Sequence, residues 1–319
     1  MKKVKKAFSL IEVIFVLVIL GIVASISSQI IVQVYENYIT QRAVYNTSTK
    51  TELVATQIVN RLTYAILGTT IAKDISNPGT LEGTNWIKLK DIPSADNNFT
   101  TIEWIGYDND SFSADSTPYW SGVANYETAS RDSFISPASH FSSVATIMSN
   151  LSKKGSTSKV DLSSSKPAGL LFMQKDDFYR DGLKYDPSCM GLIEANNTSC
   201  IFRVSLNSDT NLSFENDINT LAQLPKIVTE RYKLAWSAYA LVPELNVDGL
   251  HDLFLYYNYQ PWNGEMYNSS NSEKSLLMKN VSVLKFTENG GVIQLKLCAT
   301  ENIGADDNIS SCKEKAIIK

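Results

Sequence analysis

Few residues of the chain have types and spacings that could support catalysis or metal binding. The two histidines, His140 and His251, are not part of an H-E-x-x-H pattern, and no G-x-S-x-G, P-loop or G-x-G-x-x-G sequence occurs. The Asp-Asn-Asp run at 108–110 offers oxygen ligands of the kind that calcium prefers, but it lacks the spacing and the glycine of an EF-hand loop. We interpret this run as a solvated polar turn. We expect no enzyme activity, no metal and no cofactor.

One carboxylate occupies an unusual position. Glu12 is the single charged residue of the apolar run 8–24, whose 17 residues would span roughly 25 Å as a helix, close to the thickness of a bilayer core. An unpaired carboxylate there costs on the order of 3 kcal/mol, so Glu12 needs a partner. Four lysines at positions 2, 3, 5 and 6 precede the run. By the positive-inside rule they stay cytoplasmic, which places the rest of the chain outside.

A secretory signal peptide has a similar layout, with a basic start, an apolar core and small residues at its end. Two features argue against it. No A-x-A site follows the core, since residues 22–24 read Ile-Val-Ala, and Glu12 lies at the head of the core. A plain signal anchor stays open as an alternative.

The four cysteines form two local pairs. Cys189 and Cys200 are separated by 10 residues, and Cys298 and Cys312 by 13. None belongs to a C-x-x-C sequence, so zinc and thioredoxin-like sites gain little support. In an oxidising compartment we expect two disulfides, one for each pair, although four cysteines allow three connectivities. Buried free thiols in a cytosolic protein are the alternative.

A long helix must present Glu12. No proline precedes Pro78, and apolar positions continue at helical spacing to Ile66, before a possible stop at Gly68. We predict one helix over 8–67, on the order of 90 Å long. Residues 8–24 of this helix are transmembrane, and its amphipathic second half packs on a globular body. The fold class is therefore α+β.

The body, residues 68–319, shows short strand-like runs between polar turns, which favours an antiparallel sheet. A Ser-rich stretch at 142–167 predicts an exposed loop or a mobile insertion. The aromatic residues between 256 and 267 are interpreted as the packed face of a sheet, with a contact surface as the alternative. The predicted strands are 86–89, 101–107, 170–174, 201–206, 227–240, 250–259, 281–287, 292–299 and 316–319.

The charge distribution separates the N-terminus from the body. The whole chain of 319 residues has a net charge of −4, from 29 basic and 33 acidic residues. Without the four N-terminal lysines, 25 basic residues face 33 acidic ones, a net charge of −8. This composition excludes a polybasic nucleic-acid binder and makes direct contact with nucleic acid unfavourable. With 44% hydrophobic and 19% charged residues, the chain can build a core.

Residues 5–13, Lys-Lys-Ala-Phe-Ser-Leu-Ile-Glu-Val, resemble the leader and cleavage site of type IV prepilins, with Ala7 where that family usually has glycine. The resemblance implies that residues 1–7 are a leader peptide. A prepilin peptidase would cut after Ala7 and methylate the new amine of Phe8. Glu12, then the fifth residue of the mature chain, would pair with the N-terminal amine of a neighbouring subunit and set the register of a filament. The hairpin of 285–299 and the Cys298–Cys312 pair resemble a pilin C-terminal sheet with a disulfide-closed loop.

The body is much larger than the head of a major pilin, and the helix lacks the proline that many major pilins carry. The chain is therefore most similar to a minor pseudopilin of type II secretion. The implied protein is a single-pass subunit of the inner membrane with a periplasmic body. It joins other pilin subunits in a periplasmic or surface filament and acts at its tip or on secreted protein cargo. A minor pilin of a type IV or competence pilus, in DNA uptake or adhesion, is the alternative; a signal-anchored periplasmic enzyme is a remote one.

Four segments fit the pattern D/E-x-N-x-S/T, which resembles the extended acceptor sequence of bacterial N-glycosylation. Polar turns mix the same residue types, so chance is the alternative. The candidate acceptors are Asn98, Asn196, Asn211 and Asn308.

Overall fold

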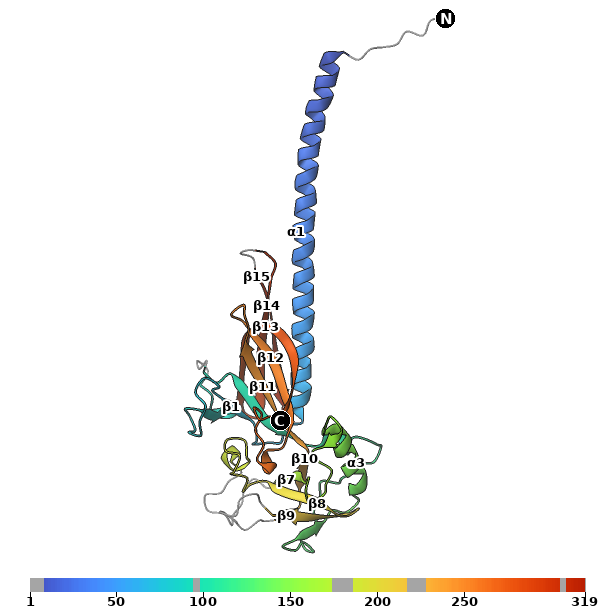
Figure 1. Cartoon of the computed structure of the whole chain (residues 1–319), viewed down its shortest axis with the longest axis vertical. Helices are drawn as coiled ribbons and strands as arrows, with labels where there is room; N and C mark the ends of the chain where they lie inside the picture. Colours follow the sequence, from blue (N-terminus) through green and yellow to red (C-terminus); the bar gives the residue numbers. More distant parts are fainter. Residues whose placement is uncertain (1–8, 94–97, 174–185, 217–227, 305–307, 319) are drawn as a thin grey trace, which may run out of the picture.

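The computed structural model describes residues 9–93, 98–173, 186–216, 228–304 and 308–318. A long N-terminal helix is followed by a body of antiparallel strands, which confirms the α+β class (Figure 1). The helices are α1 (Leu10–Thr63), α2 (Asn109–Phe112) and α3 (Phe141–Leu151), with 3-10 turns η1 (Leu89–Asp91), η2 (Pro187–Cys189) and η3 (Pro261–Asn263). The strands are β1 (Ile71–Lys73), β2 (Trp86–Lys88), β3 (Thr101–Gly106), β4 (Ser133–Ile135), β5 (Lys153–Lys154), β6 (Thr157–Ser158), β7 (Ala168–Phe172), β8 (Phe202–Ser208), β9 (Asn211–Glu215), β10 (Tyr232–Ala235), β11 (Ser237–Leu245), β12 (His251–Tyr259), β13 (Glu273–Asn289), β14 (Val292–Asn302) and β15 (Asn308–Ile318).

Helix α1 contains 54 residues and therefore extends about 81 Å. It ends at Thr63, four residues before the predicted end at 67. The next residues leave the helix because they pair with the end of β3. Ala65 forms a bridge with Gly106, and the Ile66 amide donates to the Ile105 carbonyl at 2.8 Å. A tertiary contact thus replaces the last turn that the apolar spacing predicts.

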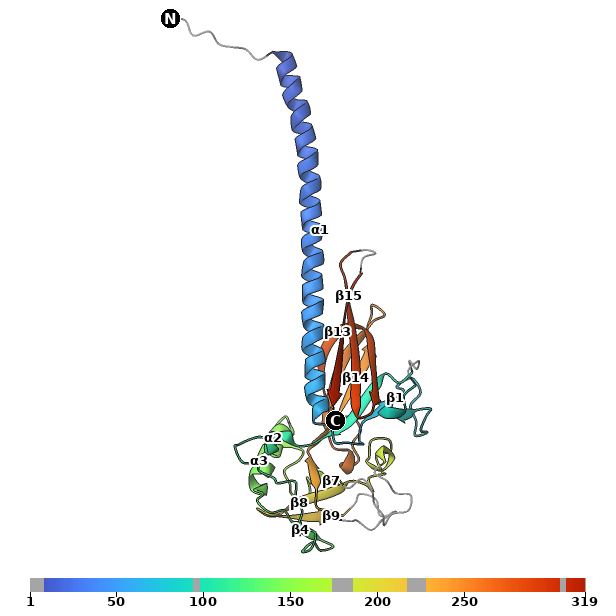
Figure 2. The same cartoon turned by 180° about the vertical axis from the view of Figure 1, so that it is seen from behind.

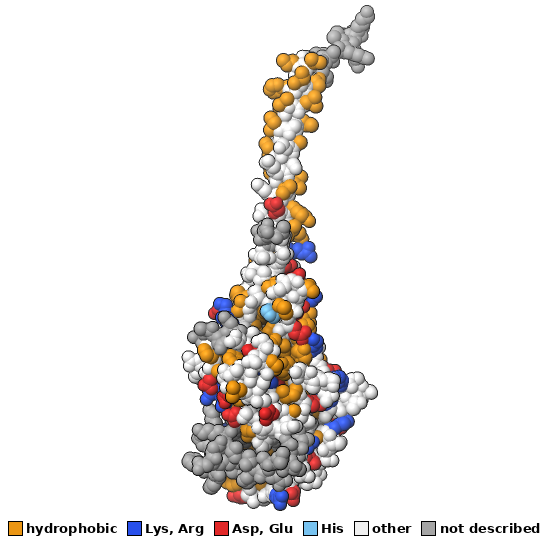
Figure 3. Space-filling model, turned by 60° about the vertical axis from the view of Figure 1, so that its left-hand side comes forward, with side chains coloured by type: hydrophobic (Ala, Val, Ile, Leu, Met, Phe, Trp, Pro, Cys, Tyr) orange, Lys and Arg blue, Asp and Glu red, His pale blue; other side chains and the backbone are white. Residues whose placement is uncertain are grey.

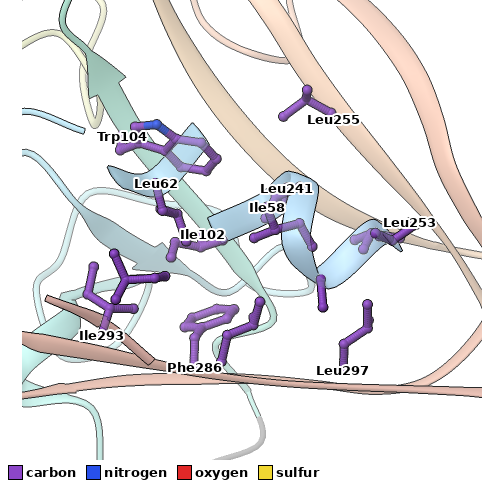
Figure 4. Packing of buried hydrophobic residues seen from close by; sticks show 14 of the residues in the cluster. Ile58, Leu62, Ile102, Trp104, Leu241, Leu253, Leu255, Phe286, Ile293 and Leu297 are labelled. Atoms are coloured by element: carbon purple, nitrogen blue, oxygen red, sulfur yellow. The ribbon is translucent and has the colours of Figure 1, made fainter. Parts of the chain in front are cut away.

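The C-terminal half of α1 packs against an eight-stranded sheet of order β15-β14-β13-β12-β11-β3-β1-β2, whose neighbours are all antiparallel. Val54, Ala55, Ile58 and Leu62 recur at helical spacing on the buried face of α1. Burying one Leu or Ile side chain contributes about 2 kcal/mol, so this contact holds the helix on the sheet. Figure 4 labels Ile58, Leu62, Ile102, Trp104, Leu241, Leu253, Leu255, Phe286, Ile293 and Leu297 of this core.

Residues 107–236, here called the distal lobe, lie between β3 and β11, which are neighbours in the eight-stranded sheet. They contain a second sheet of order β10-β7-β8-β9-β4, also antiparallel. Its core is rich in aromatic side chains, with Trp120, Phe134, Phe172 and Tyr232 buried together. Figures 1 and 2 both place this lobe beyond the C-terminal end of α1, at the opposite end of the molecule from the N-terminus.

A third apolar cluster joins the two sheets. Ile66, three residues after α1, and Ile105, near the end of β3, meet Leu171 of the distal lobe and Trp262 of η3. The indole of Trp262 donates to the carbonyl of Pro167 at 3.1 Å, so this buried ring also satisfies its polar group. The lobe is therefore packed on the eight-stranded sheet rather than tethered by its two connecting segments.

The prediction of an exposed loop over 142–167 was wrong for its first part. Helix α3 occupies Phe141–Leu151, and Phe141, Val144 and Met148 are buried on one side of it. Val160 is also buried. Serine and threonine fill the solvent face of α3 and hide the apolar i, i+3, i+7 spacing when composition alone is considered.

Most predicted strands occur with shifted ends, but three assignments needed correction. The run 227–240 is not one strand. It divides at Trp236 into β10 and β11, which belong to different sheets. Strands β1, β4, β5, β6 and β9 were not predicted; four of these five have only two or three residues, too few to show a periodic pattern. Strands β13 and β15 each begin eight residues before the predicted strand, at Glu273 and Asn308. Lys274, Ser275 and Lys279 are exposed polar residues in the added part of β13.

Candidate functional site: the apolar helix and the N-terminus

The first half of α1 stands clear of the body. Every residue from 9 to 38 is exposed, including Leu10 at 82% and Ile11 at 73%. Figure 3 shows hydrophobic side chains covering this part of the helix, whereas charged side chains are scattered over the body. Helix α1 is long and apolar enough to cross a membrane. So many apolar side chains are stable only when lipid or other apolar helices surround them.

Glu12 lies in the first turn of this exposed helix. The carbonyl of Ser9 accepts bonds from the amides of Glu12 (3.0 Å) and Val13 (3.3 Å), so the helix starts just before the carboxylate. Within the described parts of the chain, the Glu12 side chain has no hydrogen-bond or ion-pair partner. A carboxylate near a helix N-terminus is stabilised by the helix dipole, but in an apolar environment it still requires a cation. Ala7, Phe8 and the four lysines lie outside the described residues.

The second half of α1 is held in a fixed position. Beyond the apolar contact, Thr47 donates to Glu301 at 2.8 Å, which attaches the helix to the end of β14. Glu52 forms ion pairs with Lys315 and, at 3.8 Å, with Lys313 of β15, and the hydrogen bond from Lys315 lowers the pKa of the Glu52 carboxyl. The body therefore holds the C-terminal half of α1, and the exposed half projects beyond it with Glu12 in its first turn.

The comparisons with known proteins agree with this geometry. Residues 2–28 match the family model of the prokaryotic N-terminal methylation motif. The chain has a type IV pilin-like N-terminus. No curated protein and no solved structure matches the chain.

The N-terminal methylation motif explains why the apolar helix is exposed. It makes the chain a pilin-like substrate of prepilin peptidase, and it implies assembly with other pilin subunits. The motif and the exposed apolar helix together fit a single-pass anchor in the inner membrane.

Both local cysteine pairs form disulfides. Cys189–Cys200 closes the loop beside the apolar cluster that joins the two sheets. Cys298 and Cys312 face each other directly on β14 and β15, at the edge of the sheet that packs on α1. Each disulfide closes a short loop, with sequence separations of 11 and 14, and thereby removes conformational entropy from the unfolded chain.

The four candidate acceptors for N-glycosylation differ in exposure. Asn98, Asn196 and Asn308 are exposed. Asn211 lies in β9 with its Oδ1 buried, and the next residue, Leu212, belongs to the core of the distal lobe. The structure therefore argues against Asn211 as an acceptor in the folded protein.

Asp209, the acid of that same segment, has a structural role. Its carboxylate accepts bonds from the Ser142 hydroxyl and from the Ser142 amide (3.0 Å), and it lies 3.1 Å from His140 Nδ1. These contacts hold the start of α3 and lower the pKa of the Asp209 carboxyl. Serine and histidine each contact the aspartate and not each other, so the group does not have the geometry of a nucleophilic triad.

Asp108 is not in a solvated turn, contrary to the prediction for 108–110. Its side chain is buried, its Oδ1 accepts from the Ser111 amide at 3.1 Å, and its Oδ2 has no partner in the described structure. Burial raises the pKa of this carboxyl to about 7. Its backbone carbonyl accepts from the Trp120 indole at 3.1 Å, so Asp108 lies where the distal lobe begins. Sequence reasoning missed this burial because three polar residues in a row resemble a surface turn.

A buried ion pair between neighbouring strands was also missed. Lys73 Nζ of β1 lies 2.5 Å from the Glu103 carboxylate of β3, and the Tyr259 hydroxyl donates to the same carboxylate at 2.8 Å. The carbonyl of Leu192 accepts a further bond from Lys73 at 2.5 Å. Glu103 alternates with apolar residues along β3, and an acid at that position in a buried strand is the signal that could have revealed the pair.

Proposed function

We propose that the chain is a minor subunit of a pilin-like filament, acting in type II protein secretion. Its role is assembly and contact with secreted cargo, not catalysis. After cleavage behind Ala7, partner helices surround the apolar half of α1 and extract it from the inner membrane. The N-terminus is cytoplasmic because of the four lysines, and the body is periplasmic.

The position of the distal lobe is the observation that supports this proposal best. Subunits of such a filament stack with their N-terminal helices toward the base. The distal lobe extends the body in the opposite direction, beyond the end of α1 (Figure 1). A second body stacked above this subunit would meet the lobe. The geometry therefore favours a position at the filament tip, where no further subunit is stacked above the lobe and the lobe is exposed to cargo.

Glu12 gives the proposed assembly a register. In a helical bundle without water, its carboxylate and the methylated amine of Phe8 from a neighbouring subunit satisfy each other. Because both groups lie at the N-terminal end of their helices, the pair determines how far one subunit is shifted along the next.

Among the alternatives within pilin-like systems, direct DNA uptake is disfavoured by the net charge of −8 outside the N-terminal lysines. Adhesion is compatible with the same tip position. An enzyme held by a signal anchor would use α1 only as a tether and would not depend on Glu12.

The first experiment is to measure the N-terminal mass of the mature protein from its host, with and without the prepilin peptidase. We expect a start at N-methyl-Phe8 that requires the peptidase. Secretion of type II cargo is then measured in a deletion strain complemented with wild type or Glu12→Ala, with Glu36→Ala as the control for an exposed acid on the same helix. Loss of secretion with Glu12→Ala alone supports the proposal. Normal secretion in the deletion strain, with loss of piliation instead, would assign the chain to a pilus.

A further inference from the structure

A groove lies where the end of α1 meets the sheet and the distal lobe. Its volume is about 660 Å³, within the range of sites for organic ligands. Three parts of the chain form its walls: Asn60 and Tyr64 at the end of α1, Tyr107 and Asp110 at the start of the distal lobe, and Tyr257 on β12. The groove, called here the junction groove, therefore exists because the lobe is inserted at this position.

Fixed aromatic rings line the junction groove. Tyr239 stacks on the buried ring of Trp104, with centroids 5.7 Å apart, and the Arg61 guanidinium lies 5.5 Å from the Tyr239 ring centre. Tyr64 and Tyr107 meet edge to face at 5.5 Å. These contacts hold three tyrosines in place before any ligand arrives, which reduces the entropy that a ligand must offset.

Several polar side chains of the groove have no partner in the described parts of the chain, although Asn109 accepts a bond from the Ser113 hydroxyl at 3.0 Å. In the described parts of the chain, the side chains of Asn60, Asp110, Tyr257 and Ser275 make no hydrogen bond. The amide and the hydroxyls can each donate and accept hydrogen bonds, and the carboxylate can accept them, so a ligand with both donors and acceptors can be bound. Arg61 and Asp110 carry opposite charges, so the groove has no strong preference for an anion or a cation.

The junction groove continues along α1. A second cavity of about 600 Å³ shares Gln57 and Leu277 with it and reaches Thr47. The distance along the helix from Thr47 to Tyr64 is about 25 Å. An elongated ligand fits this shape better than a compact one.

We propose that the junction groove binds an oligosaccharide. A sugar ring presents apolar C–H faces to aromatic rings and hydroxyls to amides and carboxylates, and the groove provides both along its length. An extended peptide is less suitable because β12 and β13 are each paired on both sides, which leaves no free strand edge for backbone bonds. A partner helix would require a mainly apolar surface, whereas amide, carboxylate, guanidinium and hydroxyl groups are interspersed with the apolar groups of these walls. The proposal does not depend on filament assembly, since it concerns the single chain.

The test uses the full chain in phospholipid nanodiscs, which contain no sugar head groups. Cellotetraose, chitotetraose and maltotetraose are titrated by calorimetry. We expect saturable binding of at least one of them, with a Kd below about 1 mM. Tyr257→Ala should weaken it about tenfold and Tyr257→Phe, which keeps the ring, about threefold. Tyr126→Ala, an exposed tyrosine of the distal lobe outside the groove, should leave the Kd unchanged.

Three results would overturn the proposal. The first is that none of the tetrasaccharides binds. The second is that Tyr126→Ala weakens binding as much as Tyr257→Ala, or that Tyr257→Phe and Tyr257→Ala have no effect although both variants keep the wild-type Tm. The third is that tetra-alanine binds where the sugars do not, which would make the groove a peptide site. N-terminal processing is unaffected by any of these results, so failure here is distinct from failure of the proposed function.

Discussion

The buried carboxyl of Asp108 should make the stability of the body depend on pH. Burial raises its pKa from 3.8 to about 7, nearby Asp110 adds to the rise, and bonds from Ser111 oppose it. In the unfolded chain the group ionises near pH 4, whereas in the folded chain it keeps its proton until about pH 7. As the pH rises above 4, ionisation of Asp108 therefore stabilises the unfolded state but not the folded state, and the free energy of unfolding falls. The contribution of Asp108 to stability is complete below pH 4 and is lost as the pH passes 7.

The size of this effect follows from the two pKa values. The rise from 3.8 to about 7 corresponds to about 4 kcal/mol in total. Between pH 5 and pH 8, the linkage relation gives a loss of about 2.5 kcal/mol in the free energy of unfolding. Asp108→Asn keeps an oxygen that can accept from the Ser111 amide but cannot ionise. We expect wild type to lose about 2.5 kcal/mol more than this variant over that interval.

Urea unfolding of the full chain in nanodiscs, followed by tryptophan fluorescence at pH 5 and pH 8, measures this difference. The indole of Trp120, one of the five tryptophans that give this signal, donates to the Asp108 carbonyl. Asp115→Asn is the matched control, because Asp115 is an exposed acid in the same segment. Parallel pH profiles for wild type and Asp108→Asn would show that the carboxyl ionises normally, and the account of its burial would have to be abandoned.

Three further outcomes are expected. Leu62→Ala, in the helix–sheet core, should lower the free energy of unfolding, measured by urea titration, by about 3 kcal/mol. Leu53 is 58% exposed, so Leu53→Ala should lower it by less than about 1 kcal/mol. Equal losses for the two variants would contradict this packing of α1 on the sheet. Replacing Cys298 and Cys312 together with serine should cost about 3 kcal/mol for a 14-residue separation, measured in the same way, and an unchanged midpoint would refute it. In the native host, Asn196→Gln should remove a glycan mass from the intact protein, and a single unmodified wild-type mass would exclude that modification.

The N-terminal helix could be predicted from sequence, because local patterns determine it. Glu12 in an otherwise apolar run and the residues around Phe8 are adjacent in the chain, so this motif can be recognised without knowledge of the tertiary structure. The amphipathic spacing of Ile58 and Leu62 predicted the buried face of α1 for the same reason.

The distal lobe was not predictable in the same way. Nothing in the sequence marks Gly106 and Ser237 as neighbours, because 130 residues separate these paired positions. Residues that act through such long-range contacts, as Asp209 does at the start of α3, looked like parts of polar turns. The junction groove was missed for this reason too, since Tyr64, Tyr107 and Tyr257 come together only when the lobe is in place.

The pairing of Gly106 with Ser237 has a consequence for how such a chain can change. Because the lobe leaves and re-enters the sheet at one rung of the β3–β11 ladder, a two-residue turn could join these strands without disturbing their register. Lengthening a connection between fixed ends costs only a slowly growing loop entropy. The distal lobe can therefore change in sequence and length independently of the eight-stranded sheet and of the apolar helix α1.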